Sequence, residues 1–352
     1  MVTLTDIAQM AGVSPSTVSN IINNRTNVGE DTKRRVLQII EDTGYEPNYF
    51  ASSIRKRSTN MIGIVVEDLT IYTLPIVERI MAVLEDAGYK TLLTNLRMYD
   101  KWRDTWYYDE TKLIYELRNA MTQIRPIKTE GVVYVGGHCR HLRILSEFKD
   151  MNLVVAYAIS KDDEIPSVII NDEKGGYDVT NYLFDMGHTR IGVIGGADEN
   201  LHTQMRLAGY QKSLFEHGTL YDPNMVVYGN WLRESGYTAA EKLLKKKPTA
   251  LFCMNDYMAA GVYDYCYEKK IRIPEDISVI GYDNVELSEY LVPKLSTCQI
   301  NSGDIGKKAA HEMLGKLSGK SDETADISHN PENIINVSCN MIIRDSVKYI
   351  KN

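Results

Sequence analysis

The sequence predicts a small all-α domain at the N-terminus, followed by an α/β core of two doubly wound subdomains. Two observations indicate this fold class. Short apolar segments at helical spacing, with their own capping residues, fill the first 46 residues. From Met61 onward, short and nearly continuous apolar runs alternate with amphipathic segments. That alternation is typical of parallel strands covered by helices on both faces.

The composition is that of a globular protein. The chain has 352 residues, of which 43% are hydrophobic and 25% charged, enough for two or three compact units. Met1 is not followed by a basic segment and an apolar one, and no apolar run approaches the length of a membrane span, so we expect a cytoplasmic protein. The five cysteines are widely spread and lack a CxxC pair, which favours reduced thiols over disulfides or zinc ligands.

The charge is distributed unevenly along the chain. The formal net charge is -7, yet residues 1–60 hold seven Lys and Arg against six Asp and Glu. The remaining residues hold 33 basic and 41 acidic side chains. Only the N-terminal part could therefore tolerate a polyanion, and Arg55, Lys56 and Arg57 concentrate its positive charge.

Capping residues in the N-terminal part predict where its helices begin and end. Thr3 offers an N-cap hydroxyl and Asp6 follows three residues later, which is a variant of the capping box. Gly12 ends this first helix. Ser14 and Pro15 then supply an N-cap and a proline at the first position of a second helix.

The second and third helices each have one apolar face. Val18, Ile21 and Ile22 lie at i, i+3 and i+4 of the second helix. A third amphipathic helix is expected over about residues 31–43, and it ends at Gly44. Three helices with a tight turn between the first two match a helix-turn-helix, whose second helix enters the DNA major groove by its N-terminal end.

The outer face of the second helix suits such contact. It carries Pro15, Ser16, Ser19 and Asn20. Small polar side chains let the backbone approach DNA, its N–H groups favour phosphate, and Asn20 can pair with a base edge. The alternative is a small three-helix bundle on which these side chains only face solvent.

A further short helix, residues 49–56, is expected after Asn48, which can cap it. Ala51 and Ile54 form its narrow apolar stripe, so it has too little apolar area to fold alone. Such a segment could order on DNA, with Ile54 as an apolar wedge in the minor groove and Arg55 on a phosphate. A solvated basic linker is the alternative.

The remaining chain predicts two strand-helix units. Strands are expected at residues 61–66, 91–94, 131–137, 153–159, 167–170, 190–196, 249–254 and 277–283. Helical periodicity covers residues 76–87, 138–150, 175–186, 201–217, 233–246, 256–269 and 303–317. MIGIVVED and RIGVIGGAD resemble each other at the heads of two halves, which indicates two similarly wound subdomains that face a cleft.

Ligands of such folds bind at the carboxyl ends of the strands. Those ends carry Asp68, Tyr157, Asp198, Asn255 and Asp283. The arginine at position 206 could hold vicinal hydroxyls or a carboxylate with its donor fork, or could form an ion pair to a helix. The tryptophan at position 231 could form an apolar floor for a sugar, or could belong to the core.

Neither a catalytic nor a metal site is predicted. His138, Cys139 and His141 share one loop and lack the distant second ligand pair that zinc needs. The glycine patterns that bind pyrophosphate or triphosphate are missing, as are GxSxG and HExxH. We therefore expect no enzyme, no cofactor and no metal.

Six segments together resemble the LacI/GalR family of bacterial transcription regulators, in the family's order and over essentially the whole chain. They are VTLTDIAQMAGVSPSTVSNIIN, GYEPN, GHTRIGVIGG, RLAGYQKSL, ALFCMNDYMAAG and ISVIGYDN. The resemblance implies a homodimer that binds double-stranded operator DNA, responds to a small-molecule effector and has a periplasmic-binding-protein-like core.

The resemblance also implies domain boundaries. They are 1–46 for the helix-turn-helix domain, 47–60 for the hinge helix and linker, and 61–352 for the effector-binding and dimerisation domain. Within the last, the N-subdomain is expected at about 61–158 plus 296–320, and the C-subdomain at about 159–295 plus 321–347.

Residue roles follow from the same resemblance. The residues expected at operator DNA are Thr3, Ser14, Pro15, Ser16, Thr17, Ser19, Asn20, Asn23 and Asn27. Those expected in the minor groove at the hinge are Asn48, Ala51, Ile54 and Arg55, with Ile54 at the position of the family's intercalating leucine. Those expected to contact the effector are Tyr72, Tyr157, Arg206, Trp231, Asn255 and Asp283.

The chain departs from the family at several of these positions. Asn20 stands where arginine is frequent and Arg55 where alanine is usual, so we expect an operator unlike the family's commonest palindrome. Ala158 replaces a frequent aspartate and Ser302 an aromatic side chain, so a hexose is a less secure effector. The segment 98–112 is longer and more aromatic than usual, and a packed surface loop is the simplest interpretation.

Together these features predict a repressor of carbohydrate-utilisation genes whose operator affinity changes with a sugar or glycoside. The alternatives are a non-catalytic solute-binding protein and a sugar-modifying enzyme. A solute-binding protein would not explain the N-terminal helices, and no set of catalytic residues supports an enzyme.

Overall fold

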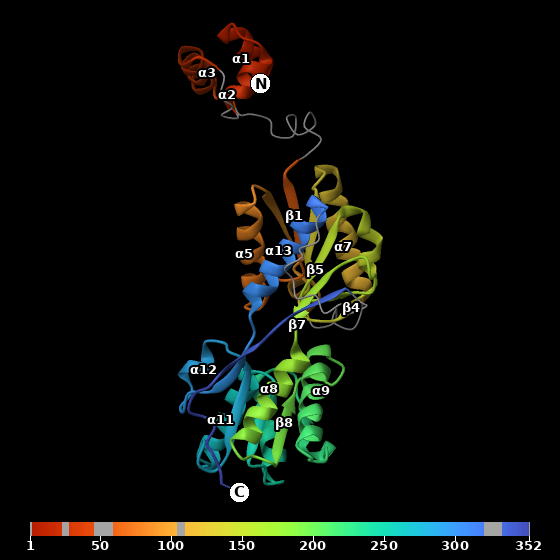
Figure 1. Ribbon diagram of the computed structural model, residues 1–352, viewed down its shortest axis with the longest axis vertical. Helices are drawn as coiled ribbons and strands as arrows, with labels where there is room; N and C mark the ends of the chain where they lie inside the picture. Colours follow the sequence, from red (N-terminus) through yellow and green to blue (C-terminus); the bar gives the residue numbers. More distant parts are fainter. Residues whose placement is uncertain (1, 23–27, 46–58, 104–109, 320–332, 352) are drawn as a thin grey trace. The chain divides into compact units, whose positions relative to one another are not determined.

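The structure is a computed structural model that describes residues 2–22, 28–45, 59–103, 110–319 and 333–351. The chain divides into two compact units, Met1–Thr59 and Asn60–Asn352 (Figure 1). Each unit is described by itself. Six residues with predicted DNA or hinge roles lie outside the described residues: Asn23, Asn27, Asn48, Ala51, Ile54 and Arg55.

The first unit contains three described helices. They are α1 (Leu4–Ala11), α2 (Pro15–Ile22) and α3 (Glu30–Thr43). Thr3 and Asp6 form the capping box of α1, in which the Asp6 N–H donates to the Thr3 hydroxyl at 3.3 Å. Gly12 ends this helix at φ +64, a left-handed conformation that glycine adopts without strain. The predicted positions of α1 and α2 are confirmed.

The N-subdomain of the second unit is built on a six-stranded sheet in the order β13-β7-β5-β3-β1-β2, whose strands all run parallel. The strands are β1 (Met61–Val66), β2 (Lys90–Asn95), β3 (Gly131–Val135), β5 (Leu153–Ala156), β7 (Ser167–Ile170) and β13 (Ile334–Val337). On one face lie α5 (Thr73–Asp86) and α13 (Ser302–Ser318), which pack against each other, and on the other face lies α7 (Glu110–Ile124). Both faces are covered, which explains the nearly continuous apolar runs.

The C-subdomain has a second six-stranded sheet in the order β14-β12-β11-β10-β8-β9. Its strands are β8 (Ile191–Gly195), β9 (Val226–Tyr228), β10 (Ala250–Cys253), β11 (Ser278–Asp283), β12 (Ser296–Gln299) and β14 (Asn340–Ile342), and β14 pairs antiparallel with β12. Its main helices are α8 (Asp172–Asp185), α9 (Leu201–Glu216), α10 (Arg233–Leu244) and α11 (Asp256–Lys269). The two doubly wound subdomains agree with the predicted fold class (Figure 1).

Several shorter elements complete the fold. They are α6 (Met98–Trp102), α12 (Leu287–Tyr290), β4 (His141–Leu142), β6 (Ile159–Ser160) and the 3-10 helices Arg125–Ile127, Ile144–Met151 and Pro223–Met225. The helix predicted over residues 138–150 was wrong in its first half, because that stretch forms a loop and β4. Among the described residues, no helix is both long and apolar enough to cross a membrane.

Glycines let the helices of the C-subdomain pack closely in pairs. A Cβ atom on Gly176 of α8 would lie 2.2 Å from the backbone oxygen of Arg206 in α9. A Cβ atom on Gly209 of α9 would likewise lie 2.0 Å from the backbone oxygen of Glu173 in α8. Because neither position tolerates a side chain, the two backbones are in contact. This contact fixes the position of the first turns of α9 against α8.

The chain passes between the two sheets at different places from those predicted. Strands β7 and β13 belong to the first sheet and β12 to the second. The N-subdomain therefore continues to Ile170 rather than to residue 158, and the chain crosses over after Ile170, Gln299 and Val337. An apolar run shows that a strand is buried on both faces, but it does not show which sheet the strand joins.

Candidate functional site

The N-terminal end of α2 presents small polar side chains that its own cap holds in place. The Ser14 hydroxyl accepts the Thr17 N–H at 3.2 Å and lies 2.6 Å from the Ser16 hydroxyl. Pro15, Ser16 and Asn20 are exposed, and α2 contains no acidic side chain that would repel a phosphate. The described part of the predicted DNA face on α2 is thus an uncharged surface whose first turn is held by its own cap.

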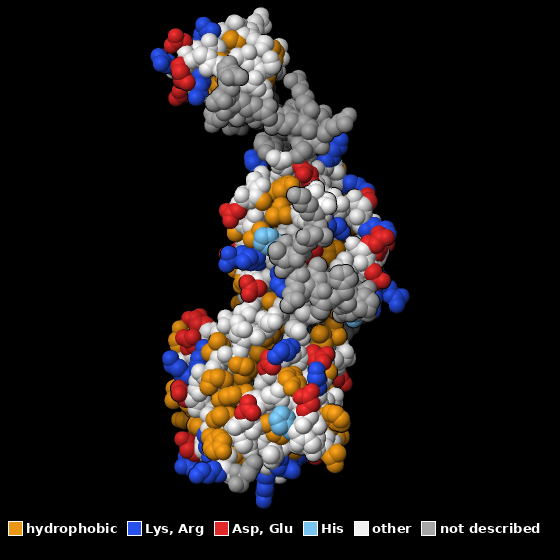
Figure 2. Space-filling view, viewed as in Figure 1, with side chains coloured by type: hydrophobic (Ala, Val, Ile, Leu, Met, Phe, Trp, Pro, Cys, Tyr) orange, Lys and Arg blue, Asp and Glu red, His pale blue; other side chains and the backbone are white. Residues whose placement is uncertain are grey.

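The opposite face of α2 anchors it in the first unit. Val18 and Ile21 are buried against Ile7 of α1 and Val36 of α3. Among the other residues predicted at DNA, Thr3 and Ser14 act as caps, and Thr17 and Ser19 are partly buried. On the face of the α/β unit shown in Figure 2, basic and acidic side chains are interspersed rather than gathered into a basic stripe.

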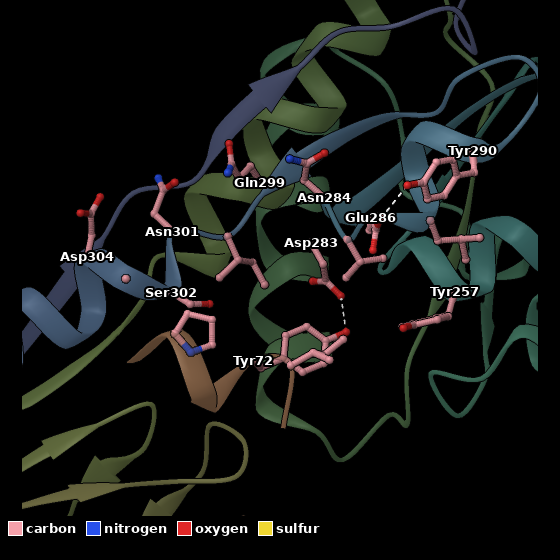
Figure 3. Close-up of a pocket in the computed structure, with 16 residues that line it drawn as sticks. Tyr72, Tyr257, Asp283, Asn284, Glu286, Tyr290, Gln299, Asn301, Ser302 and Asp304 are labelled. Atoms are coloured by element: carbon pink, nitrogen blue, oxygen red, sulfur yellow. Dashed lines mark hydrogen bonds between the residues drawn. The ribbon is translucent and has the colours of Figure 1, made fainter. Parts of the chain in front are cut away.

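The α/β unit contains a cavity of about 730 Å³ at the carboxyl ends of its strands (Figure 3). Tyr72 and Pro75 line it from the N-subdomain, and Tyr257 and residues 283–287 line it from the C-subdomain. Residues 299–304 line it from a crossover segment. A ligand in this cavity would therefore touch both subdomains and one of the connections between them.

A hydrogen bond joins the two subdomains at the inner wall of the cavity. The Tyr72 hydroxyl donates to Oδ2 of Asp283 at 2.9 Å (Figure 3). Burial raises the pKa of Asp283 to about 6, although the nearby guanidinium of Arg206 opposes the shift. Burial, together with the charge of Asp283, also raises the pKa of Tyr72. This tyrosine therefore remains a neutral donor.

Arg206 lies behind this wall, where Asp172 and a backbone carbonyl engage two of its three nitrogens. Its Nε donates to Asp172 at 2.7 Å, and its Nη1 donates to the Met254 carbonyl and lies 3.6 Å from Asp283. The guanidinium carbon lies 3.7 Å from the centroid of the Tyr282 ring. The side chain is only 3% exposed and does not line the cavity. Its partner Asp172 lies in the first turn of α8. The alternative role given for Arg206 from the sequence, an ion pair to a helix, is therefore what the structure shows.

Tyr157 and Asn255 are buried and Trp231 is partly buried, and none of the three lines the cavity. Asn255 caps α11 by accepting the Met258 N–H at 2.8 Å and donates to the Trp231 carbonyl at 2.9 Å. Tyr157 is 6% exposed, and its ring centroid lies 5.2 Å from that of His202. Of the six residues predicted to contact an effector, Tyr72 and Asp283 line the cavity.

Sequence reasoning missed a second connection between the subdomains. His202 of α9 lies 2.6 Å from Asp172 through Nδ1, and its Nε2 accepts the backbone N–H of Cys139 at 3.1 Å. Burial opposes the charge on Asp172, but Arg206 and His202 outweigh it and lower the pKa of this carboxyl. The Asp172 carboxylate thus holds both Arg206 and His202 in place. The only signal in the sequence was an acidic residue two positions after the end of the buried strand 167–170.

The loop around Cys139 is fixed by a buried ion pair. Arg140 donates two hydrogen bonds to Glu67, at 2.6 and 3.0 Å, and the Gly137 N–H donates to the same carboxylate at 2.7 Å. Glu67 also accepts the Tyr134 hydroxyl. Within the described residues, no group of three or more His, Cys, Asp or Glu could hold a metal ion.

Asp256 fixes the segment of the C-subdomain that lines the cavity around Val285. Its carboxylate accepts the Val285 N–H at 2.9 Å and the Thr297 hydroxyl at 2.7 Å. Burial, reinforced by the charge of Asp283, raises the pKa of Asp256 to about 8. The segment that carries Asp283 and Glu286 is thereby tied to β12.

Comparison with known proteins places this architecture in a family. A model described as "Bacterial regulatory proteins, lacI family" matches residues 3–48, and one described as "Periplasmic binding protein-like domain" matches residues 180–347. The "HTH-type transcriptional repressor PurR" of Vibrio campbellii is 31% identical over 99% of both chains. The protein of the same name from Histophilus somni is also 31% identical over 99% of both chains.

Solved structures share the fold. The Lac repressor dimer bound to operator and the anti-inducer ONPF aligns with a TM-score of 0.79 and 22% identity over 99% of both chains. The transcriptional regulator CelR in complex with cellobiose aligns with a TM-score of 0.64 and 23% identity over 98% of this chain and all of that one. Both domain models match this chain, and the PurR relatives are similar to it over nearly their whole length. This chain therefore belongs to the LacI/GalR family of bacterial transcription regulators and is a transcriptional repressor of that family.

Proposed function

We propose that this protein represses genes of carbohydrate utilisation and that a small sugar-like effector in the cavity of the α/β unit changes its affinity for operator DNA. The observation that carries the proposal is the Tyr72–Asp283 hydrogen bond at the inner wall of that cavity. A ligand that rearranges this contact acts on both subdomains at once. It can therefore favour one of their relative orientations.

We assign operator reading to α2. Pro15, Ser16 and Asn20 lie on its exposed face, and Asn20 can make paired hydrogen bonds to a base edge in the major groove. A homodimer would present two such helices to the half-sites of a pseudo-palindromic operator. Arg55, Lys56 and Arg57 would add phosphate contacts from the hinge.

A sugar-like effector is supported by the chemistry of the cavity. Tyr72 and Tyr257 offer aromatic faces, and Asp283, Gln299 and Asn301 offer polar groups that can hydrogen-bond hydroxyls. One structural neighbour carries cellobiose. Aromatic faces also stack on nucleobases, so nucleosides belong in the same test.

The coupling between effector and operator is a free energy, typically about 1–3 kcal/mol. It arises only if the ligand binds one orientation of the subdomains better than the other. The wall residues supply the necessary differential contact, because Tyr72 and Asp283 belong to different subdomains.

The test is titration of the full-length protein with DNA from palindromic sites upstream of its own gene and of neighbouring genes. Specific binding should weaken steeply with salt, and Asn20→Ala should lower affinity for the operator while changing the salt slope little. Sugars, glycosides and nucleosides are then screened for a thermal shift and for a changed operator affinity. Turnover of a sugar without any operator binding would instead identify an enzyme, and ligand binding without operator binding would identify a solute-binding protein.

A further inference from the structure

We infer that the cavity prefers a ligand that carries a positive charge beside hydroxyl groups, such as an amino sugar, over its neutral and anionic analogues. This inference rests on the proposed function, since it takes the cavity as the effector site. It adds the charge of the ligand, which neither the family nor the relatives specify.

The first support is the balance of charge on the cavity wall. Asp283, Glu286 and Asp304 line the cavity, and no Lys or Arg is among the described residues that line it. Glu286 and Asp304 are exposed acidic side chains on this wall. In Figure 3, Asp304 lies toward one end of the cavity and Glu286 toward the other. The carboxylates therefore favour a cationic group over an anionic one beside them.

Two largely buried arginines close to the acidic wall are engaged by other groups, while Arg79 lies near Gly303 at the Asp304 end of the cavity. Arg206 is bound by Asp172 and contacts only the buried side of Asp283. Arg344 donates to Asn284, Ser288 and the Leu295 carbonyl behind the wall. Neither guanidinium lines the cavity, and both are largely buried.

The second support is that several donors on the wall are engaged while its carboxylates can still accept. The Tyr72 hydroxyl donates to Asp283, and the Tyr290 hydroxyl donates to Glu286 at 2.6 Å (Figure 3). The Asn301 side-chain amide donates to the Ser338 carbonyl at 2.9 Å. Tyr257, Gln299 and Ser302 add groups that can donate to the hydroxyls of a ligand. The carboxylate oxygens of Glu286 and Asp304 accept hydrogen bonds, and an ammonium group supplies three donors to such acceptors.

The third support is aromatic. Three tyrosine rings, Tyr72, Tyr257 and Tyr290, line the same cavity as the carboxylates. A cation near the face of such a ring is attracted by its quadrupole, and the attraction grows as water is excluded. Carboxylates and aromatic rings together favour an organic cation. The same rings also accommodate the apolar face of a sugar.

The experiment is calorimetric titration of the full-length protein with two series of related sugars that are cationic, neutral or anionic. The probes are glucosamine, glucose and glucose 6-phosphate, together with galactosamine, galactose and galactose 6-phosphate. At least one amine should bind about tenfold more tightly than its neutral parent, with the phosphate ester weakest, and the amine's advantage should shrink as salt is added. Equal or tighter binding of the neutral parent or of the phosphate ester overturns the inference, as does the absence of binding by both amines at millimolar concentration.

A pair of variants separates charge from shape. Glu286→Gln removes one charge from the wall but keeps an oxygen that can accept the Tyr290 hydroxyl, so the ratio of amine to neutral affinity should fall severalfold. Glu275→Gln removes the charge of an exposed glutamate that does not line the cavity, and it should leave that ratio unchanged. An unchanged ratio in Glu286→Gln would refute the role assigned to this carboxylate. Failure of the proposed function itself looks different, because then no ligand of any charge alters operator affinity.

Discussion

At the scale of single residues, the α/β unit contains a chain of paired charges that reaches its cavity at one end. Asp283 faces the cavity, Arg206 lies behind it, and Asp172 links Arg206 to His202. Each charge has an oppositely charged neighbour in this chain. Removal of one member therefore leaves a buried charge without a partner, which costs far more than the loss of a surface ion pair.

Arg206→Ala should accordingly destabilise the α/β unit by about 3–5 kcal/mol, because Asp172 and Asp283 lose their guanidinium. The measurement is the free energy of unfolding from urea denaturation. Arg272→Ala is the matched control, since Arg272 pairs with Asp276 on the surface and its loss should cost about 1 kcal/mol or less. Similar losses in the two variants would contradict the role of Arg206.

The buried carboxylates also predict how stability depends on pH. The pKa of Asp256 is about 8 in the folded chain, above its unfolded value, so the folded state holds the extra proton between these values. The contribution of Asp256 to stability should therefore be fully present below its unfolded pKa and fall by up to about 1.4 kcal/mol per pH unit until pH reaches about 8. Asp283, with a pKa of about 6, adds to this pH dependence only below about pH 6.

Asp256→Asn isolates this contribution. An asparagine can accept the Val285 N–H and donate to the Thr297 hydroxyl oxygen, so the contacts are kept while the titration is lost. The unfolding free energy of this variant should fall less than that of the wild type between about pH 6 and about pH 8. Asp264→Asn, at an exposed ion pair, should retain the wild-type slope. Parallel slopes for all three proteins would rule out Asp256 as the source.

At the scale of elements, the features that could be predicted were those that neighbouring residues determine. The caps of α1 and α2 and the glycine at the end of α3 were each predicted from residues within four positions of one another. Glu67 and Arg140 were missed because they lie 73 positions apart, and only the sheet brings them together. Asp283 was named as a side chain at the carboxyl end of a predicted strand and Tyr72 through a family resemblance, but no local pattern relates these residues, which lie 211 positions apart.

Close packing between helices gives a prediction within a single element. In α13, a Cβ atom on Gly306 would lie 2.3 Å from the backbone oxygen of Ile76 in α5, whereas a Cβ atom on Gly303 would have only Arg79 Nε, at 3.9 Å, nearby. Gly306→Ala should therefore destabilise the chain by about 1–3 kcal/mol. Gly303→Ala should be neutral or stabilise by up to about 1 kcal/mol, because alanine favours the helix. Thermal unfolding of both variants decides this, and a stable Gly306→Ala chain would show that α5 and α13 are farther apart.

At the scale of the whole molecule, the function requires that a change between the subdomains reach the DNA-binding helices. The chain crosses between the two sheets three times, and side-chain contacts join the subdomains beside those crossings. Tyr72–Asp283 and Cys139–His202 are two such contacts, and each is a single hydrogen bond. Contacts of this size can be broken and remade by one ligand, since each contributes about 0.5–1.5 kcal/mol.

Tyr72→Phe tests the coupling without any effector. It removes the hydrogen bond to Asp283 while the ring remains, so the balance between orientations of the subdomains should shift, and operator affinity should change by about 2- to 10-fold. Tyr290→Phe is the matched control, because its hydroxyl also lines the cavity but bonds to Glu286 within the C-subdomain. It should leave effector-free operator affinity unchanged. Fluorescence anisotropy with labelled operator measures both. If Tyr72→Phe also bound operator like the wild type, the contact across the subdomains would have no part in the coupling, and the effector would have to act through the crossover segments alone.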